Sequence, residues 1–171
     1  MTAPADLLIT NGIVMTVDPD HRVIQHGAVA VVGDTITAVG PADTVASLPA
    51  RETIDAAGGI IMPGLVNTHT HAAMTLFRGL ADDLPLEEWL HGHIFPAEAR
   101  FIRPETVRWG TLLACAEMLL AGTTTCCDGY FYENAVREAL QTSGMRAVLA
   151  QGVIDFPAPG VPDPKENIRI P

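Results

Sequence analysis

Two kinds of hydrophobic pattern divide the chain near residue 58. Up to that point, short apolar runs alternate with turn residues, which is typical of strands in a small antiparallel sheet or half of a β-sandwich. Two hairpins are predicted: strands 7–9 and 13–17 around a turn at 10–12, and strands 28–32 and 35–40 around Gly33-Asp34.

Beyond residue 58, strand-like and helix-like segments alternate. Apolar residues at helical spacing predict one helix over residues 104–120, with proline in its first turn and Gly122 as its stop. A second helix is predicted over residues 134–143, closed by Gly144. The apolar side chains expected to face the core are Leu112, Leu113, Ala116, Leu119 and Leu120 in the first helix, and Ala135, Val136, Ala139 and Leu140 in the second.

The strands between these helices indicate the fold class. Residues 65–68, 123–127 and 145–154 are short strand-like runs, the last apolar almost throughout, as expected of a parallel strand covered on both faces. Strand, helix, strand, helix, strand with right-handed crossovers predicts a parallel α/β sheet, either doubly wound or closed into a barrel. A complete (β/α)8 barrel takes ~250 residues, and this segment supplies only about three of its units. An open parallel edge would expose unpaired backbone groups that promote aggregation, so we interpret the 171-residue chain as incomplete.

Composition limits the classes of function. The chain is 48% hydrophobic and 18% charged, which is a globular composition. Its formal charge of −10 argues against a nucleic-acid-binding protein, which would carry a basic face. No segment approaches the ~20 apolar residues of a membrane span, and the N-terminus lacks a signal sequence, so a cytoplasmic location is the default expectation. The three cysteines are expected to be reduced thiols, because neighbours such as Cys126 and Cys127 are poorly placed to form a disulfide.

The candidate chemistry lies in a His-Thr-His sequence at the end of the first predicted parallel strand. In a strand, residues i and i+2 point to the same face, so His69 and His71 project together, about 7 Å apart along the chain, within reach of one metal ion. Barrel enzymes place their catalytic groups at this end of their strands. A His-X-His pair also arises by chance, and the chain contains a second one, His91-Gly92-His93. That pair follows a helix-like surface segment and is interpreted as loop or helix-end histidines.

The residues around the first pair resemble a known family. Residues 61–71 (Ile-Met-Pro-Gly-Leu-Val-Asn-Thr-His-Thr-His) resemble the first-strand signature of the amidohydrolase superfamily. Residues 72–90 resemble the 5-methylthioadenosine/S-adenosylhomocysteine deaminases, with guanine deaminases and triazine hydrolases as close cousins. The resemblance runs nearly from end to end. It implies an incomplete (β/α)8 TIM-type barrel over residues 59–171, its first three or so βα units, preceded by part of a small β-sandwich over residues 1–58.

The resemblance also implies a metal-dependent mechanism. In the family, one divalent ion, usually zinc, is held by two residues matching His69 and His71 together with a later His and a later Asp. The ion lowers the pKa of a bound water. The resulting hydroxide attacks C6 of adenine and ammonia leaves, with a later Glu moving the proton. Those later residues are not found in this sequence, and two protein ligands fall short of the three that catalytic zinc normally has. We therefore expect weak metal binding and no meaningful turnover from this chain alone, with no catalytic residue in it beyond the metal ligands.

Two further residues are candidates for substrate binding by resemblance. Glu98 matches the position from which the family's deaminases reach the ribose hydroxyls, and a carboxylate can accept both vicinal hydroxyl protons. Its alternative interpretation is a solvated charge in a turn. Trp89 is expected to wall the pocket, although a Trp in an amphipathic segment is more often a packing residue. Asp128 follows the second predicted parallel strand, where capping or loop hydrogen bonding explains it as well as catalysis does. Gln151 stands where some relatives carry an Arg.

These inferences predict a hydrolytic deaminase of adenosine thioethers, which converts S-adenosylhomocysteine or 5'-methylthioadenosine into the inosine analogue and ammonia. One alternative is a guanine deaminase or triazine-type hydrolase with the same front end, and Glu98 discriminates because those substrates carry no ribose. A second alternative is a catalytically silent fragment that acts as an assembly module. The expected partner is a small nucleoside substrate, with no nucleic acid and no membrane. The sequence leaves open the metal, the preferred thioether and the oligomeric state, a homo-oligomer included.

Overall fold

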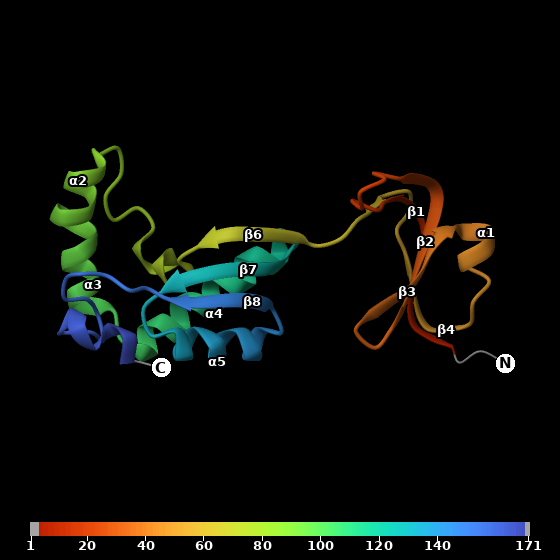
Figure 1. Cartoon of the computed structure of the whole chain (residues 1–171). Coiled ribbons are helices and arrows are strands. Elements are labelled where there is room, and N and C mark those ends of the chain that lie inside the picture. Colours follow the sequence, from red (N-terminus) through yellow and green to blue (C-terminus); the bar gives the residue numbers. More distant parts are fainter. Residues whose placement is uncertain (1–3, 170–171) are drawn as a thin grey trace. The chain divides into compact units, whose positions relative to one another are not determined.

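The computed structural model describes residues 4–169 and forms two compact units, within residues 1–63 and 64–171 (Figure 1). The first unit is a mixed five-stranded sheet in which the strand order is β3-β2-β1-β4, with β5 also pairing with β1. Its elements are β1 (Ala5–Met15), β2 (Val23–Val32), β3 (Thr35–Pro41), α1 (Ala42–Val45), β4 (Ala50–Asp55) and β5 (Ile60–Ile61). Because β5 pairs with β1, residues just beyond 58 pack with this unit.

One of the two predicted hairpins is confirmed and the other is wrong. β2 and β3 pair antiparallel around Gly33, which has a φ of +59°. Residues 10–12, however, form no turn: β1 runs straight through them, with register irregularities between Ile9 and Val14. Asn11 has a φ of 55°, and its side-chain amide donates a 2.8 Å hydrogen bond to Asp55 of the parallel neighbour β4. An Asn-Gly sequence such as Asn11-Gly12 is compatible with a β-bulge as well as with a turn. Here the strand continues, because β1 pairs with β4 and β5 on either side of these residues.

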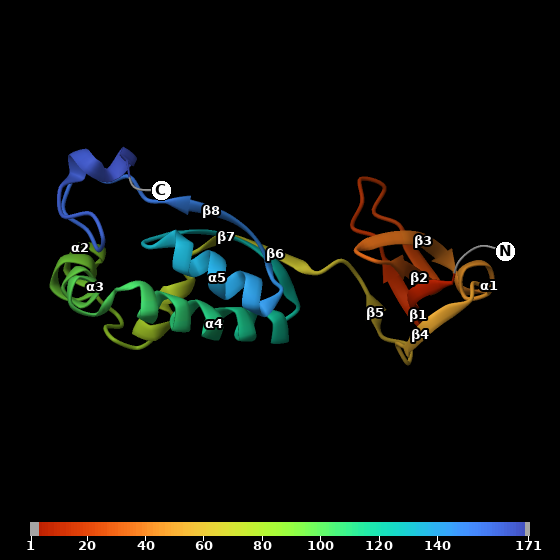
Figure 2. The same ribbon diagram turned by 90° about the horizontal axis from the view of Figure 1, so that it is seen from below.

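The second unit is a parallel sheet of three strands with two helices on one of its faces (Figures 1 and 2). The strands are β6 (Leu65–Thr70), β7 (Thr123–Tyr130) and β8 (Arg146–Gln151), in the order β6-β7-β8. The remaining elements are η1 (Ala72–Phe77), α2 (Leu86–Glu88), the π-helical turn η2 (Trp89–Ile94), α3 (Phe95–Phe101), α4 (Pro104–Leu120), α5 (Glu133–Ser143) and η3 (Pro164–Arg169). The predicted parallel α/β arrangement is confirmed for these three strands.

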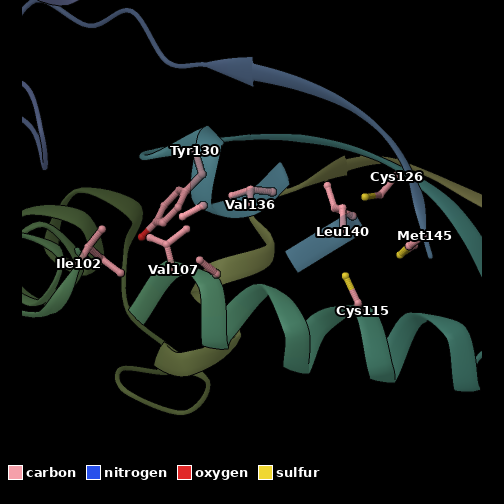
Figure 3. Close-up of a cluster of buried hydrophobic side chains, with 10 residues drawn as sticks. Ile102, Val107, Cys115, Cys126, Tyr130, Val136, Leu140 and Met145 are labelled. Atoms are coloured by element: carbon pink, nitrogen blue, oxygen red, sulfur yellow. The ribbon is translucent and has the colours of Figure 1, made fainter. Parts of the chain in front are cut away.

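The two long helices of this unit follow the predicted bounds closely. α4 spans the predicted residues, and Gly122 beyond it has a φ of +84°. α5 begins one residue earlier than predicted and ends at Gly144 in the left-handed conformation. All four of its predicted inward residues are buried, and Val136 and Leu140 enter the core cluster drawn in Figure 3. Within residues 4–169, no helix is both long enough and apolar enough to cross a membrane.

The predicted inward face of α4 is wrong. Leu113, Leu119 and Leu120 are exposed, Leu120 by 90%. The buried positions are instead Val107, Gly110, Thr111, Ala114 and Cys115. The reason lies at Gly110, where a Cβ atom would stand 2.6 Å from the carbonyl oxygen of Ala73 in η1. The helix therefore turns its small residues toward η1, which allows a closer approach than a leucine face would.

The expectation that the third strand is covered on both faces is also wrong. β8 is shorter than predicted and alternates between exposed and half-buried residues, with Val148 65% exposed. Leu65 and Val66 of β6 are likewise exposed. Only the central strand β7 is well covered, with Cys126, Asp128 and Tyr130 buried. In the described residues the helices cover one face of this sheet, so the apolar side chains of the other face stay accessible.

Candidate active site

The two predicted histidines lie together at the carboxyl end of β6. The Nε2 atoms of His69 and His71 are 3.4 Å apart, and the ring planes meet at 80°. Two imidazole nitrogens that bind one tetrahedral zinc ion at 2.0–2.1 Å would be separated by about 3.3 Å. The pair therefore already has the spacing that a shared divalent ion requires.

His71 is oriented by the neighbouring strand. Its Nδ1 atom lies 2.5 Å from the carbonyl oxygen of Gly129 in β7. Because a carbonyl oxygen can only accept, Nδ1 carries a proton, and in the neutral ring the lone pair is therefore on Nε2. Metal-binding histidines commonly donate their second ring nitrogen to a carbonyl or carboxylate in this way. The contact thus supplies the tautomer that a metal ligand needs.

Asp128 supports the chain immediately after His71. It lies within β7, where the sequence analysis placed it just past the strand, and is 3% exposed. Its Oδ1 atom accepts a 2.6 Å hydrogen bond from the backbone N–H of Ala72, the first residue of η1. Burial raises the pKa of this carboxyl group, while the Ala72 hydrogen bond and the nearby His71 oppose the rise. The contact joins residues 56 positions apart, so it is neither a helix cap nor a bond within one loop, and it holds the start of η1 against the end of β7.

Glu98 is buried, so its interpretation as a solvated charge in a turn is wrong. It lies on α3 and is 5% exposed. Its Oε1 atom accepts a 2.8 Å hydrogen bond from the hydroxyl of Tyr130 at the end of β7. Burial raises the pKa of Glu98, and the hydrogen bond from Tyr130 and the charge of His71 partly offset that rise. A buried carboxylate is costly unless it is hydrogen-bonded, and the Tyr130 hydroxyl supplies one such bond.

His71, Glu98, Gly129 and Tyr130 line one cavity of about 810 Å³. Its wall is mostly apolar and comes from the end of β7, from η2 and α3, and from the segment after β8. The lining residues are His71, Met74, Trp89, Leu90, Ile94, Phe95, Glu98, Ala99, Gly129, Tyr130, Phe131, Gly152, Ile154, Phe156, Pro157, Ala158, Pro159 and Pro162. The structure therefore brings Trp89 and Glu98 to the same cavity as His71, and His69 stands beside His71.

The second His-X-His pair belongs to a different environment. His91 and His93 lie in η2 and are absent from the cavity lining. The Nε2 atom of His91 is 3.3 Å from the carboxylate of Glu87, and its ring meets that of Phe95 edge-on. Within residues 4–169, no group of three or more His, Cys, Asp or Glu side chains is placed to hold a metal ion. The candidate ligands are therefore His69 and His71.

The sequence analysis missed Gly129 and Tyr130. Both follow the predicted strand 123–127, which in the structure continues to residue 130. Had the strand been extended, Asp128 and Tyr130 would have been placed at the same carboxyl edge of the sheet as the histidines. The last residues of β7 were not predicted as strand because Asp128 and Gly129 have low strand propensity.

Comparison with known proteins places this geometry in a family. Residues 60–170 match the Amidohydrolase family. The chain belongs to that family. The amidohydrolase relatives include a 5-methylthioadenosine/S-adenosylhomocysteine deaminase of Syntrophobacter fumaroxidans, 57% identical over 91% of this chain and 35% of the relative. They also include a 5'-deoxyadenosine deaminase of Methanosarcina barkeri, 48% identical over 97% of this chain and 38% of the relative.

A solved amidohydrolase structure is similar over almost all of the chain. It is a zinc-bound adenosine deaminase from Xanthomonas campestris, with a TM-score of 0.92 and 42% sequence identity. The match covers 97% of this chain and 38% of the other. The chain thus spans little more than a third of the length of these amidohydrolases.

Proposed function

We propose that this chain carries the first part of the active site of a metal-dependent deaminase that acts on adenosine thioethers. The reaction would convert 5'-methylthioadenosine or S-adenosylhomocysteine, with water, into the inosine analogue and ammonia. Residues 1–58 would contribute to the flanking β-sandwich and residues 59–171 would form the first units of a (β/α)8 barrel. The observation that carries the proposal is the oriented pair His69 and His71 beside a cavity that also contains the buried Glu98.

His69 and His71 would hold one divalent ion, with zinc as the expected metal. Support comes from the 3.4 Å separation of their Nε2 atoms and from the contact between His71 Nδ1 and the Gly129 carbonyl, which favours the tautomer of the neutral ring with its lone pair on Nε2. A bound ion would supply an activated water for attack at C6 of the purine. The protein's own contribution here would be to orient the His71 ring at the edge of the cavity and to place the His69 ring beside it.

Glu98 and Trp89 would bind the nucleoside. The carboxylate of Glu98 can accept hydrogen bonds from the two vicinal ribose hydroxyls, and its position in the cavity wall suits that contact. Trp89 would form part of the apolar wall around the substrate. Guanine and triazines carry no ribose, so they offer no vicinal hydroxyls for this carboxylate to bind. It therefore favours a nucleoside over those alternative substrates.

A second candidate substrate is 5'-deoxyadenosine, because relatives 48% identical to this chain are named 5'-deoxyadenosine deaminases. The lining of the cavity agrees with an apolar 5' group: it includes Phe95, Phe156 and Pro157, and no Lys or Arg is among the described residues that line it. The amino acid part of S-adenosylhomocysteine carries a carboxylate that would need a cationic partner there. We therefore expect 5'-methylthioadenosine and 5'-deoxyadenosine to be better substrates than S-adenosylhomocysteine.

The experiment is ammonia release with zinc from 5'-methylthioadenosine, 5'-deoxyadenosine, S-adenosylhomocysteine, adenosine and guanine. It is run on this chain and on a longer form that extends to the length of the relatives. Because two histidines fall short of the three ligands of catalytic zinc, we expect turnover only from the longer form. Deamination of guanine alone would instead favour the rival amidohydrolase activity. Inactivity of both forms toward all five compounds would favour a silent fragment or assembly module, and turnover by the 171-residue chain itself would contradict the expected incompleteness.

A further inference from the structure

Tyr130 links the core of the second unit to the candidate substrate site. Its ring is 5% exposed and belongs to the same buried cluster as Val107 and Val136 (Figure 3). From this position its hydroxyl donates to Oε1 of Glu98 at 2.8 Å, although the two residues lie 32 positions apart on different elements. The ring is also among the residues that line the cavity. Tyr130 is therefore a core side chain whose polar end reaches the site.

The backbone of Tyr130 is fixed as firmly as its ring. Its N–H donates a 2.6 Å hydrogen bond to Oε1 of Glu133 at the start of α5. Tyr130 is also paired in register with Gln151 of β8. Its ring centroid lies 4.8 Å from that of Phe131. With both the main chain and the ring constrained, the hydroxyl has little freedom to move away from Glu98.

Glu98 depends on such a fixed donor. A buried carboxylate is strongly disfavoured without a hydrogen-bond donor, and it would either rotate toward water or take up a proton. A phenol is protonated at neutral pH, so the Tyr130 hydroxyl is available as that donor. The bond engages only Oε1, and each carboxylate oxygen can accept more than one hydrogen bond. Glu98 therefore keeps acceptor capacity for a ligand while its orientation is held.

We propose that Tyr130 is a positioning residue, which holds the Glu98 carboxylate in the orientation that accepts the ribose hydroxyls of the substrate. This inference rests on the proposed function, because it takes Glu98 as the ribose contact. It goes further in assigning the orientation of Glu98 to a residue of β7 rather than to α3 alone. The alternative is that the Tyr130–Glu98 bond only stabilises the fold, in which case its loss would weaken binding of all nucleosides equally or not at all.

The test compares two ligands that differ only in the ribose hydroxyls. Binding of adenosine and of 2',3'-dideoxyadenosine to the longer form described above, kept free of zinc so that neither ligand is turned over, is measured by calorimetry for the wild type, Tyr130→Phe, Glu98→Ala and Tyr132→Phe. Tyr130→Phe removes one hydroxyl and keeps the ring that fills the core. Tyr132→Phe is the matched control, because it makes the same change two residues away at a side chain outside the cavity lining.

We expect the wild type and Tyr132→Phe to prefer adenosine. Tyr130→Phe should bind adenosine about tenfold more weakly, the effect of losing a hydrogen bond to a charged group, with unchanged affinity for the dideoxy analogue. If Glu98→Ala removes the preference and Tyr130→Phe keeps it, the positioning role is wrong and the ribose contact stands. If the wild type binds neither nucleoside or shows no preference, the proposed ribose contact itself is wrong.

A second measurement needs no ligand. The side-chain carboxyl carbon of Glu98 is followed by NMR through a pH titration in the wild type and in Tyr130→Phe, with Tyr132→Phe as the control. Because the Tyr130 hydroxyl stabilises the charged form of Glu98, Tyr130→Phe should raise the pKa of Glu98. An unchanged titration in a folded variant would overturn the positioning role.

Discussion

At the scale of single residues, three successive positions of β7 organise the candidate site. The Asp128 carboxylate accepts a hydrogen bond from the N–H of Ala72, and the carbonyl oxygen of Gly129 accepts one from the ring of His71. The hydroxyl of Tyr130 donates one to the carboxylate of Glu98. One strand end therefore fixes His71 just after β6, Ala72 at the start of η1, and Glu98 on α3. These three residues of β7 therefore act by positioning other groups of the site, and none of them is expected to react itself.

Asp128 can be tested through the hydrogen bond that it accepts from the N–H of Ala72. Asp128→Ala leaves the buried N–H of Ala72 without an acceptor and should lower the free energy of unfolding by about 1–3 kcal/mol in urea titrations. Asp128→Asn keeps an oxygen for that bond and should cost clearly less, since the other carboxylate oxygen, Oδ2, is buried without a hydrogen-bond partner among the described residues. Equal losses in the two variants would show that the charge of Asp128, not its hydrogen bond, stabilises the fold.

Glu133 gives a prediction on pH. Its burial, together with the negative charge of Asp128, raises its pKa from 4.5 to about 7. The folded protein thus binds this proton more tightly than the unfolded chain, so the stabilisation is complete below pH 4.5 and is lost as pH rises through 7. Glu133→Gln keeps the acceptor for the Tyr130 N–H and removes the titration.

We therefore expect the stability of Glu133→Gln, relative to the wild type, to rise between pH 4.5 and 8. The expected gain is roughly 1–2 kcal/mol, less than the full pKa shift implies because the side chain is only half-buried. Denaturant unfolding of both proteins at several pH values measures it, and the difference between them cancels the titration of other groups. A difference that stays constant with pH would mean that Glu133 has an ordinary pKa in the folded state.

At the scale of elements, sequence pattern predicted where α4 begins and ends but not which face is buried. Proline and glycine mark the helix ends by local backbone chemistry, which can be read directly. The buried face depends on a tertiary contact, the close approach of Gly110 to Ala73, and apolar residues surround the helix so completely that periodicity could not select it. α5 has a single apolar stripe, and its face was predicted correctly.

The close approach at Gly110 can be tested by adding one methyl group. A Cβ atom there would meet the carbonyl oxygen of Ala73 at 2.6 Å, so Gly110→Ala should destabilise the protein by about 1–3 kcal/mol despite the higher helix propensity of alanine. Gly92→Ala is the control, because Gly92 is also helical and a Cβ there has no neighbour within 4 Å. That variant should be neutral or slightly stabilised in thermal unfolding. Equal effects from both changes would refute the packing explanation.

At the scale of the whole molecule, the sequence predicted the parallel strand–helix order and the family, and it predicted that His69 and His71 lie together at the end of one strand. It failed where long-range pairing decides: β1 continues through Asn11 because β4 and β5 pair with it, and β7 continues to Tyr130 beside β8. The cavity could not be predicted either, because the segment after β8 enters its wall through Phe156 and Pro157, and local pattern carries no signal for that contact.

The central claim is that His69 and His71 hold one divalent ion, and the most direct measurement is zinc affinity by competition with a chromophoric chelator. His69→Ala and His71→Ala are each compared with His91→Ala, a matched change in the other His-X-His pair. We predict at least about a tenfold loss of affinity in the first two variants and none in the third, because only the first pair has two ring nitrogens at ligand spacing. Equal affinity in all three variants, or loss only in His91→Ala, would contradict the account.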